Sequence, residues 1–395
     1  MIGKAGGAVE GRMLFFLPWE FDMVGGVDVV VDRLWREIER TMPKRTLIGI
    51  QDWVFEGEKS DPAGRPFLHL NFPAPPDASP LSLRYLLTAL RRLPVMLARL
   101  RRHDIQVVNF HFPQLNVYPV ALLKRLGLWR GRIVLSFHGS DVRKIDATSP
   151  AWRLIASQTD AITACSASLA ERVKALGLFG QTPIRVVYNG IDSAHFQAES
   201  GDSGIAAGTR FILNIGNFVP GKAQDVLIKA FARVADSIPD LKLVFAGGTA
   251  DNDSWLNGLR QLASELNISD RVHFLERIPQ RQVADLMRQA ICLAHSALDE
   301  AFGLVVIEAG ACRLPVVATR VGGIPEIISS PEFGWLYEAG DVTGLAEALT
   351  AVLHGPEEAS RRADKLLQRV QSQFSVGATA SGYLDACLDR SPAGV

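Results

Sequence analysis

The sequence has few cysteines and no long apolar run. Its cysteines lie far apart, and no two of them form a C-x-x-C pair (Cys165, Cys292, Cys312 and Cys387). A disulfide framework or a cysteine-rich zinc site is therefore not expected. No stretch approaches the roughly 20 apolar residues of a spanning helix, and residues 1–10 lack the apolar core of a signal peptide. We expect a cytoplasmic protein that contacts a membrane surface at most, on the inner face.

An excess of charge of one sign is also absent. The 395 residues contain 42 Lys and Arg against 42 Asp and Glu, which excludes a nucleic-acid binder that works by bulk charge. The charge is uneven along the chain, because residues 1–195 hold 25 basic and 18 acidic residues and the remainder holds 17 and 24. This asymmetry indicates that the halves meet different molecules and that an anion approaches the first half.

Short apolar runs alternate with helix-like stretches throughout the chain. The runs are rich in Val, Ile, Leu and Phe and do not alternate with polar residues, which is typical of a parallel sheet covered by helices on both faces. The predicted strands are residues 13–17, 46–50, 107–110, 133–137, 161–164, 185–187, 211–215, 241–246, 272–275, 291–295 and 315–318. The predicted helices include residues 29–40, 223–236, 253–266, 281–289 and 374–388.

This alternation occurs twice, and the length suits two domains. The sequence therefore predicts an α/β protein with two doubly wound Rossmann-like domains that face each other across a cleft. Residues 198–208 (AESGDSGIAAG) are small, polar and glycine-rich, so we predict a hinge linker there. The first domain would comprise residues 1–197 and a C-terminal helix at about residues 374–395, and the second residues 209–373. Residues 52–80 are expected to be irregular.

Residues 291–328 form the most informative stretch. A strand ends near Ser296 and a helix begins near Leu304. The amides of Gly303, Leu304 and Val305 then lack partners within the helix, and with the helix dipole they form an anion site suited to a phosphate or diphosphate. Gly303 removes a side chain that would block the approach of that phosphate.

Two glutamates flank this helix start. Glu308 lies about one turn into the helix, where an ionised carboxylate accepts hydrogen bonds and suits two vicinal hydroxyls such as a ribose diol. Glu300 lies before the helix, and five rises of roughly 1.5 Å, counted from Gly303, put Glu308 about 7–8 Å further along the axis. That distance suits two carboxylates that bind two parts of one long ligand. It fits less well the two catalytic carboxylates of a retaining hydrolase, which lie roughly 5–5.5 Å apart. Spacing alone leaves open a capping glutamate and an ordinary surface glutamate.

The residues around these glutamates carry a family resemblance. Residues 300–308 (EAFGLVVIE), 309–318 (AGACRLPVVA) and 321–326 (VGGIPE) resemble the E-x7-E signature of retaining, nucleotide-sugar-dependent glycosyltransferases with the GT-B architecture. Within them the chain is similar to the large group-1 family. Further stretches match in the same order, so that the resemblance extends over roughly residues 11–388: residues 25–27 (GGV), 136–141 (SFHGSD), 187–192 (VYNGID) and 214–222 (NIGNFVPGK).

The resemblance implies transfer of a sugar, with retention of configuration, from a nucleoside-diphosphate-sugar to an acceptor. It implies that the second domain holds the donor and the first the acceptor. The acceptor stays open between a glycan, a lipid-linked molecule and a small molecule, and a lipid-linked or envelope polysaccharide is one hypothesis. The catalytic residues it implies are His138, Glu300 and Lys222. The donor-binding residues it implies are Gly26, Asn217, Lys222, Ile278, Glu300, Phe302, Gly303, Leu304, Val305 and Glu308.

No cofactor is expected besides the donor substrate, and no metal site is predicted. The D-x-D at residues 251–253 lacks a supporting context for magnesium. No G-x-G-x-x-G fingerprint follows the first strand, which counts against a nicotinamide enzyme.

The sequence departs from the family pattern at three positions. Asn217 stands where the family usually has an arginine that contacts the diphosphate, so either the donor binds more weakly or another cation, such as Arg277, replaces that contact. Ala223 and Arg313 replace glycines that are common in the family, and we expect both to be tolerated within helices.

Several alternatives remain open from the residues alone. A sugar-nucleotide epimerase uses the same two-domain shell without an acceptor, and a non-catalytic nucleotide-sugar-binding subunit would fit the absence of arginine at Asn217. Lys222 could be a solvated lysine at a helix start, and His138 a core histidine. His111 is expected to be structural, and Asp141 either caps its loop or touches substrate.

Residues 84–102 contain arginines among leucines and no acidic residue. They predict either a solvated helix face that is broken near Pro94 or a surface that meets anionic lipid or an anionic acceptor. The expected partners are thus a nucleotide-sugar donor, an unidentified acceptor and an anionic membrane, but no nucleic acid.

Overall fold

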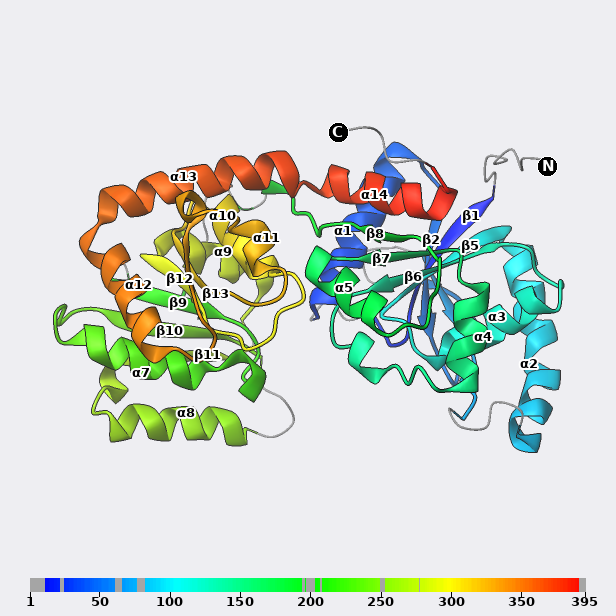
Figure 1. Cartoon of the computed structure of the whole chain (residues 1–395), viewed down its shortest axis with the longest axis horizontal. Coiled ribbons are helices and arrows are strands. Elements are labelled where there is room, and N and C mark those ends of the chain that lie inside the picture. The colour runs from blue at the N-terminus through cyan, green and yellow to red at the C-terminus, as the bar shows by residue number, and fades with distance from the viewer. Residues whose placement is uncertain are drawn as a thin grey trace. The chain divides into compact units, whose positions relative to one another are not determined.

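The computed structural model describes residues 11–21, 25–60, 66–76, 82–193, 196, 203–206, 208–248, 253–276 and 278–390. The chain divides into two compact units, which are Met1–Gly190 together with Val376–Val395, and Ile191–Ser375. Figure 1 shows a sheet with helices around it in each unit. The chain therefore returns to its first unit at the C-terminal end.

The first unit is built on an eight-stranded sheet with the order β3-β4-β2-β1-β5-β6-β7-β8. Every pairing is parallel except that of β3 with β4. The strands are β1 (Arg12–Leu17), β2 (Thr46–Gln51), β3 (Gly57–Ser60), β4 (Pro66–Leu70), β5 (Ile105–His111), β6 (Arg132–Phe137), β7 (Ala161–Ala164) and β8 (Ile184–Val186). The helices are α1 (Gly26–Thr41), α2 (Leu83–Arg102), α3 (Tyr118–Arg125), α4 (Pro150–Gln158), α5 (Ala167–Ala175) and α14 (Val376–Leu388).

Apolar side chains explain how α1 and α14 cover this sheet. Residues 13–17 of β1 are fully buried, and Phe15 shares one core cluster with Leu34 of α1 and Tyr383 of α14. In Figure 1, the red α14 lies beside the blue α1, although the two helices are far apart in the sequence. The C-terminal helix is therefore part of the first unit's core.

The second unit is built on a six-stranded parallel sheet with the order β11-β10-β9-β12-β13-β14. The strands are β9 (Phe211–Ile215), β10 (Lys242–Gly247), β11 (Val272–Glu276), β12 (Cys292–His295), β13 (Val316–Thr319) and β14 (Trp335–Tyr337). The helices are α7 (Gln224–Ala235), α8 (Ser254–Glu265), α9 (Gln280–Gln289), α10 (Leu304–Ala311), α11 (Ile324–Ile327), α12 (Val342–His354) and α13 (Pro356–Gln373). The two doubly wound sheets confirm the predicted α/β class.

Some elements differ from the sequence-based expectations. Residues 52–80 are not wholly irregular, because they contain β3 and β4. The polar β3 (GEKS) lies at the sheet edge and offers no apolar run to recognise. The helix around Pro94 is also unbroken, since α2 continues through it to Arg102. Pro94 lacks the N–H that would donate to the carbonyl four residues earlier, at Leu90, so only one helical hydrogen bond is lost. Leu90 is exposed, so water can bond to that carbonyl instead.

The division of the chain lies earlier than the predicted hinge. The second unit begins at Ile191, and in agreement with this the Phe196 carbonyl accepts a hydrogen bond from Nη1 of Arg288 at 2.9 Å. Within the predicted linker, the Ser203 hydroxyl donates to Oε1 of Gln289 in α9 at 2.7 Å. Residues 197–202 and 207 lie outside the described residues, so the hinge itself stays a prediction.

Candidate active site

Two of the predicted catalytic side chains meet in the second unit. Nζ of Lys222 lies 2.7 Å from Oε2 of Glu300 and donates a hydrogen bond to it. Lys222 ends a 3-10 turn, η3 (Pro220–Lys222), after β9, and Glu300 follows β12. Since β9 and β12 are neighbouring parallel strands, their carboxyl ends bring the two loops together.

Backbone contacts fix these two loops to each other. The Ser296 hydroxyl donates to the Lys222 carbonyl at 2.8 Å, and the Leu298 amide donates to the Gly221 carbonyl at 2.9 Å. The side chains of Lys222 and Glu300 remain 31% and 18% exposed, so a ligand can reach both of them. The ion pair is thus held by its backbone and is still accessible.

His295 lies beside this ion pair, although sequence analysis missed it. Its Nε2 lies 3.4 Å from Oε2 of Glu300, and its carbonyl accepts a hydrogen bond from the Tyr337 hydroxyl at 3.1 Å. Burial by itself raises the pKa of Glu300, but the neighbouring His295 and the Lys222 charge outweigh it and hold that pKa well below its usual range. Glu300 is therefore an ionised carboxylate at neutral pH. The position of His295 at the carboxyl end of β12 was the available signal.

The predicted anion site lies directly after this pair. Gly303 precedes α10, and the first amides of that helix, at Leu304 and Val305, have no helical carbonyl to bond. Gly303 has φ of 112°, and a Cβ there would lie 2.4 Å from Cδ1 of Ile324. The glycine is therefore favoured by the left-handed backbone, in addition to any role in the approach of a phosphate.

Another glycine supports the backbone of Glu300. Gly322 has φ of 50°, and a Cβ there would lie 1.6 Å from the Glu300 carbonyl oxygen. The Gly323 amide donates to that same carbonyl at 3.3 Å. The V-G-G segment thus shapes the loop that carries the catalytic candidate.

The remaining donor-site candidates have diverse surroundings. Glu308 is half-buried in α10, and Ile278 is half-buried between β11 and α9. The Phe302 side chain is 2% exposed and packs against Phe374, with ring centroids 5.8 Å apart, so only its backbone could reach a donor. The Asn217 carbonyl accepts a hydrogen bond from Nε2 of Gln224 at 3.0 Å. Arg277, the candidate substitute cation, lies outside the described residues.

The expectation for Ala223 and Arg313 was wrong. Neither continues a helix, because their φ angles are 47° and 56°, in the left-handed region that favours glycine. Ala223 directly precedes α7, and Arg313 follows α10 and forms a bidentate pair with Asp364. Both positions therefore carry backbone strain that a glycine would avoid.

In the first unit, His138 follows β6 in a loop fixed by Asp141. The Asp141 carboxylate accepts hydrogen bonds from the amides of His138 at 2.9 Å, Gly139 at 2.7 Å and Val142 at 3.0 Å. Asp141 therefore caps its loop. Gly26, the other candidate in this unit, is the exposed first residue of α1.

A second histidine lies against His138. Nδ1 of His111, at the end of β5, is 3.0 Å from Nε2 of His138, and the rings stack with centroids 5.3 Å apart. Burial lowers the pKa of His138 to about 4. Burial, together with the neighbouring His138, also holds the pKa of His111 well below its usual range. At neutral pH both rings are therefore uncharged, and the His138 ring can orient a ligand through hydrogen bonds but not through charge.

Comparison with known proteins shows which family this chain resembles. Residues 196–366 match the family described as glycosyl transferases group 1, and residues 24–195 match the one described as Glycosyltransferase Family 4. The N-acetyl-alpha-D-glucosaminyl L-malate synthase of Bacillus anthracis is 31% identical over 291 residues, which cover 72% of this chain and 74% of that protein. The chain belongs to the group 1 glycosyltransferases. The predicted resemblance is confirmed.

Other relatives of this glycosyltransferase agree. A GDP-mannose-dependent alpha-(1-6)-phosphatidylinositol monomannoside mannosyltransferase of Mycolicibacterium smegmatis is 29% identical, with 68% of this chain and 73% of that protein covered. The crystal structure of Anabaena Alr3699/HepE in complex with UDP matches with a TM-score of 0.75 at 18% identity, covering 95% of this chain and 98% of that one. That likeness confirms the GT-B fold of the glycosyltransferase.

Replacing Gly322 of the glycosyltransferase by alanine should displace the Glu300 loop. The added Cβ would overlap a backbone carbonyl that cannot rotate away, so we expect a loss of about 2–4 kcal/mol in the free energy of unfolding. Gly340→Ala is the matched control, because Gly340 also has positive φ but meets nothing within 4 Å. It should cost about 1 kcal/mol. Equal losses in urea denaturation of the two variants would contradict this account.

The histidine pair should make the stability of the glycosyltransferase depend on pH. His138 binds a proton at about pH 4 when folded and at about pH 6.5 when unfolded. The free energy of unfolding should therefore be constant in this respect above pH 6.5 and fall as the pH is lowered toward 4. An NMR titration, with the His138 signal assigned from His138→Gln, should show a midpoint near 4. A midpoint near 6.5 would contradict the burial.

Proposed function

We propose that this chain is a retaining glycosyltransferase that moves a sugar from a nucleoside-diphosphate-sugar to a glycan acceptor. The observation that carries the proposal is the Lys222–Glu300 pair, with Nζ and Oε2 2.7 Å apart, directly before the N-terminus of α10. The group thus combines a cation, a carboxylate and free backbone donors. The names of relatives support a nucleotide-linked donor, since one is GDP-mannose-dependent and one structure contains UDP.

In this proposal the second unit holds the donor. Lys222 and the amides of residues 303–305 bind the diphosphate, while Glu300 binds hydroxyls of the transferred sugar. Glu308 binds the ribose hydroxyls, and Ile278 lies near the base. Asn217 supplies a neutral contact where other members use arginine, and Gly26 approaches the phosphate from the first unit.

The chemical demand on the site is the charge that develops on the leaving diphosphate. Preorganised amides and an ammonium group can stabilise that charge without reorganisation during the reaction. We propose that transfer needs neither a metal nor a cofactor, so that turnover should survive EDTA. Retention would follow from attack on the same face of the sugar, with the leaving phosphate accepting the proton of the acceptor hydroxyl. The neutral His138 would orient the reacting sugar by a hydrogen bond.

Removing the Lys222 cation should impair the reaction more than the fold. A thermal-shift screen of UDP-, GDP- and ADP-sugars identifies the donor, because bound ligand at 100 times its dissociation constant stabilises by about 2.7 kcal/mol. With that donor, Lys222→Ala should lower kcat by about 10²–10³, since it loses charge stabilisation in the transition state. Glu300→Gln should also lower it strongly.

Lys229→Ala is the matched control, because Lys229 lies on the neighbouring helix α7 and pairs with Asp225 at the surface. Its kcat should equal that of the wild type. The proposal fails if no nucleotide-sugar stabilises the protein, or if Lys222→Ala turns over at the wild-type rate.

We further propose that α2 contacts an anionic membrane, where a lipid-linked acceptor would be found. Large apolar side chains of this helix are exposed, among them Leu87 and Leu90, and they lie among the exposed Arg84 and Arg91. Interfacial helices combine such apolar and basic residues. Among the described residues, no helix combines the length and apolar character needed to cross a bilayer.

The structure also separates the arginines of α2 by their contacts. Arg92 and Arg99 point to Glu56, with Nη1 of Arg92 3.5 Å from its Oε1 and Nη2 of Arg99 3.2 Å from its carbonyl oxygen. Arg84 and Arg91 are therefore the better probes of a lipid contact.

Flotation with vesicles that contain phosphatidylglycerol tests this contact. The wild type should float with them, and Arg84→Ala/Arg91→Ala should remain in the bottom fraction, because about 1 kcal/mol of attraction is lost per basic residue. Arg153→Ala/Lys174→Ala removes the same charge elsewhere in the first unit and should float like the wild type. Equal recovery of all three proteins would refute the membrane contact.

A further inference from the structure

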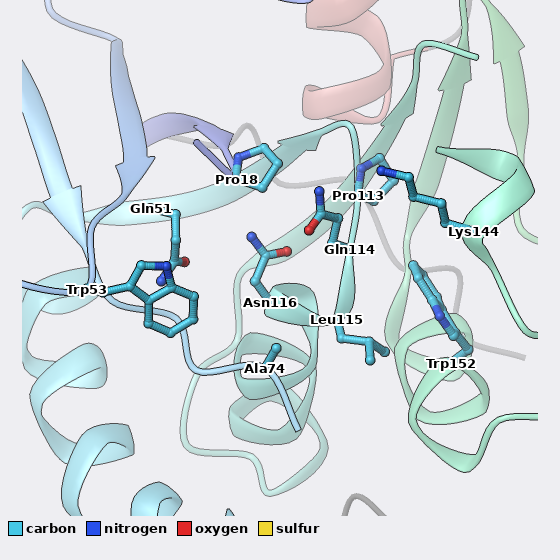
Figure 2. Close-up of a pocket in the computed structure, with 10 residues that line it drawn as sticks. All are labelled: Pro18, Gln51, Trp53, Ala74, Pro113, Gln114, Leu115, Asn116, Lys144 and Trp152. Carbon is cyan, nitrogen blue, oxygen red and sulfur yellow. The ribbon is translucent and has the colours of Figure 1, made fainter. Parts of the chain in front are cut away.

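The histidine beside His138 is completely buried. His111, the last residue of β5, is 0% exposed, whereas the side chain of His138 is half-buried. The backbone turns directly after His111, because Phe112 has φ of 55° and its amide donates to the Ser136 carbonyl at 3.0 Å. Figure 2 shows residues 113–116 after this turn, which line a pocket of their own. His111 therefore lies in the core and does not reach a ligand itself.

Aromatic rings fix the orientation of the His111 side chain. Its ring centre lies 5.4 Å from that of Phe15 in β1 and 5.4 Å from that of Tyr383 in α14. Both neighbours are fully buried, and close packing leaves little room for the imidazole to rotate. A flip of the ring would also put a carbon where Nδ1 now meets His138. The nitrogen that faces His138 is therefore Nδ1.

The contact between the two histidines is a hydrogen bond between neutral rings. Nδ1 of His111 and Nε2 of His138 lie 3.0 Å apart, and the lowered pKa of each ring keeps it uncharged at neutral pH. A neutral imidazole has one N–H and one bare nitrogen. Two arrangements are thus possible, in which either His111 donates from Nδ1 or His138 donates from Nε2.

The other nitrogen of His111 decides between these arrangements. Its Nε2 is buried and has no hydrogen-bond partner among the described residues. If His138 donated, His111 would carry its proton at that atom, as a buried N–H without an acceptor. On the backbone, such N–H groups are rarer than under-satisfied carbonyls, and an imidazole N–H also costs free energy when it is buried unpaired. The geometry therefore favours donation from Nδ1 of His111.

This direction of donation determines what His138 offers to a ligand. Because its Nε2 accepts from His111, the proton of the neutral His138 ring lies at Nδ1. Within the part of the chain that the structure describes, the ring has no other hydrogen bond, so its Nδ1–H is available. Stacking on His111, with centroids 5.3 Å apart, and the loop held by Asp141 fix the direction of that N–H.

We propose that His111 is a positioning residue that fixes His138 in the Nδ1–H tautomer, so that His138 donates a hydrogen bond to an oxygen of the transferred sugar. The contact with the sugar rests on the proposed function, whereas the tautomer does not. A ring that presents an N–H has no lone pair there to take a proton. His138 is therefore not the base for the acceptor hydroxyl, which leaves that proton to the departing phosphate.

NMR of the full chain, labelled with ¹⁵N in its histidines, tests the tautomer without any ligand. Two-bond ¹H–¹⁵N correlations distinguish an Nδ1–H ring from an Nε2–H ring, and His138→Gln assigns the His138 signals. At neutral pH, His138 should carry its proton at Nδ1 and have a bare Nε2. A proton at Nε2 of His138 would overturn the proposal, and this measurement needs no substitution of His111.

Two substitutions of His111 separate positioning from packing. The amide of asparagine lies near the position of Nδ1 and can donate to His138, whereas that of glutamine lies near the position of Nε2 and leaves the contact empty. Both remove the ring, so both should lose similar stability in thermal unfolding. His138 should keep the Nδ1–H form in His111→Asn and lose this preference in His111→Gln. Equal tautomer populations in the two variants would show that His111 only fills space.

Turnover gives a second comparison of the same variants, with the donor that the thermal-shift screen identifies. His111→Gln should lower kcat about 2–10-fold, the effect of one neutral hydrogen bond, and leave the donor KM within about twofold, because other residues bind the diphosphate. His111→Asn should stay close to the wild type. His103→Gln is the matched control, since His103 is another buried histidine of the first unit, and it should change neither the tautomer nor kcat. Equal kcat values for the two His111 variants would overturn the positioning role.

The outcomes keep this inference separate from the proposed function. If His138 has the Nδ1–H form and no nucleotide-sugar stabilises the protein, the tautomer assignment stands and the proposed function fails. If nucleotide-sugar turnover depends on Lys222 while His138 carries its proton at Nε2, the proposed function stands and the role of His111 fails.

Discussion

The contact on which the donor-side site depends is the ion pair between Lys222 and Glu300. Both residues lie in loops, and a pair between two loops is useful only where the backbone holds it in place. Hydrogen bonds from Ser296 and Leu298 tie the loops together, and Gly322 allows a second loop to approach the Glu300 carbonyl. Because Glu300 is held as a carboxylate, the site contains a fixed negative charge beside a cation and a helix N-terminus.

The candidate residues of the first unit are kept neutral by burial, whereas those of the second unit form an ion pair. His111 and His138 stack against each other, and both have lowered pKa values. The Asp141 carboxylate accepts hydrogen bonds from the backbone amides of the loop that carries His138. The result is a neutral, firmly oriented ring at the end of β6. Such a ring suits the orientation of a hydroxyl group more than the stabilisation of a leaving group.

Much of this arrangement was predictable because parallel strands buried on both faces leave uninterrupted apolar runs. Those runs located nearly every central strand, and the E-x7-E stretch located Glu300 and the start of α10. Strands β3, β4 and β14 escaped, and β3 did so because it is polar and offers no apolar run. His295 escaped because no motif includes it, although its place at a strand end was visible. The left-handed backbone of Ala223 and Arg313 could not be read from residues that usually favour helix.

The sequence by itself determined the fold class, the family and the loops that carry the candidate residues, because hydrophobic periodicity and local motifs depend on neighbours along the chain. Only the tertiary structure decided which side chains meet. The pairing of Lys222 with Glu300 joins residues 78 positions apart, and the contact of His111 with His138 joins residues 27 apart. Such contacts follow from strand order and register, which place distant loops at one edge of a sheet, and no local pattern encodes them.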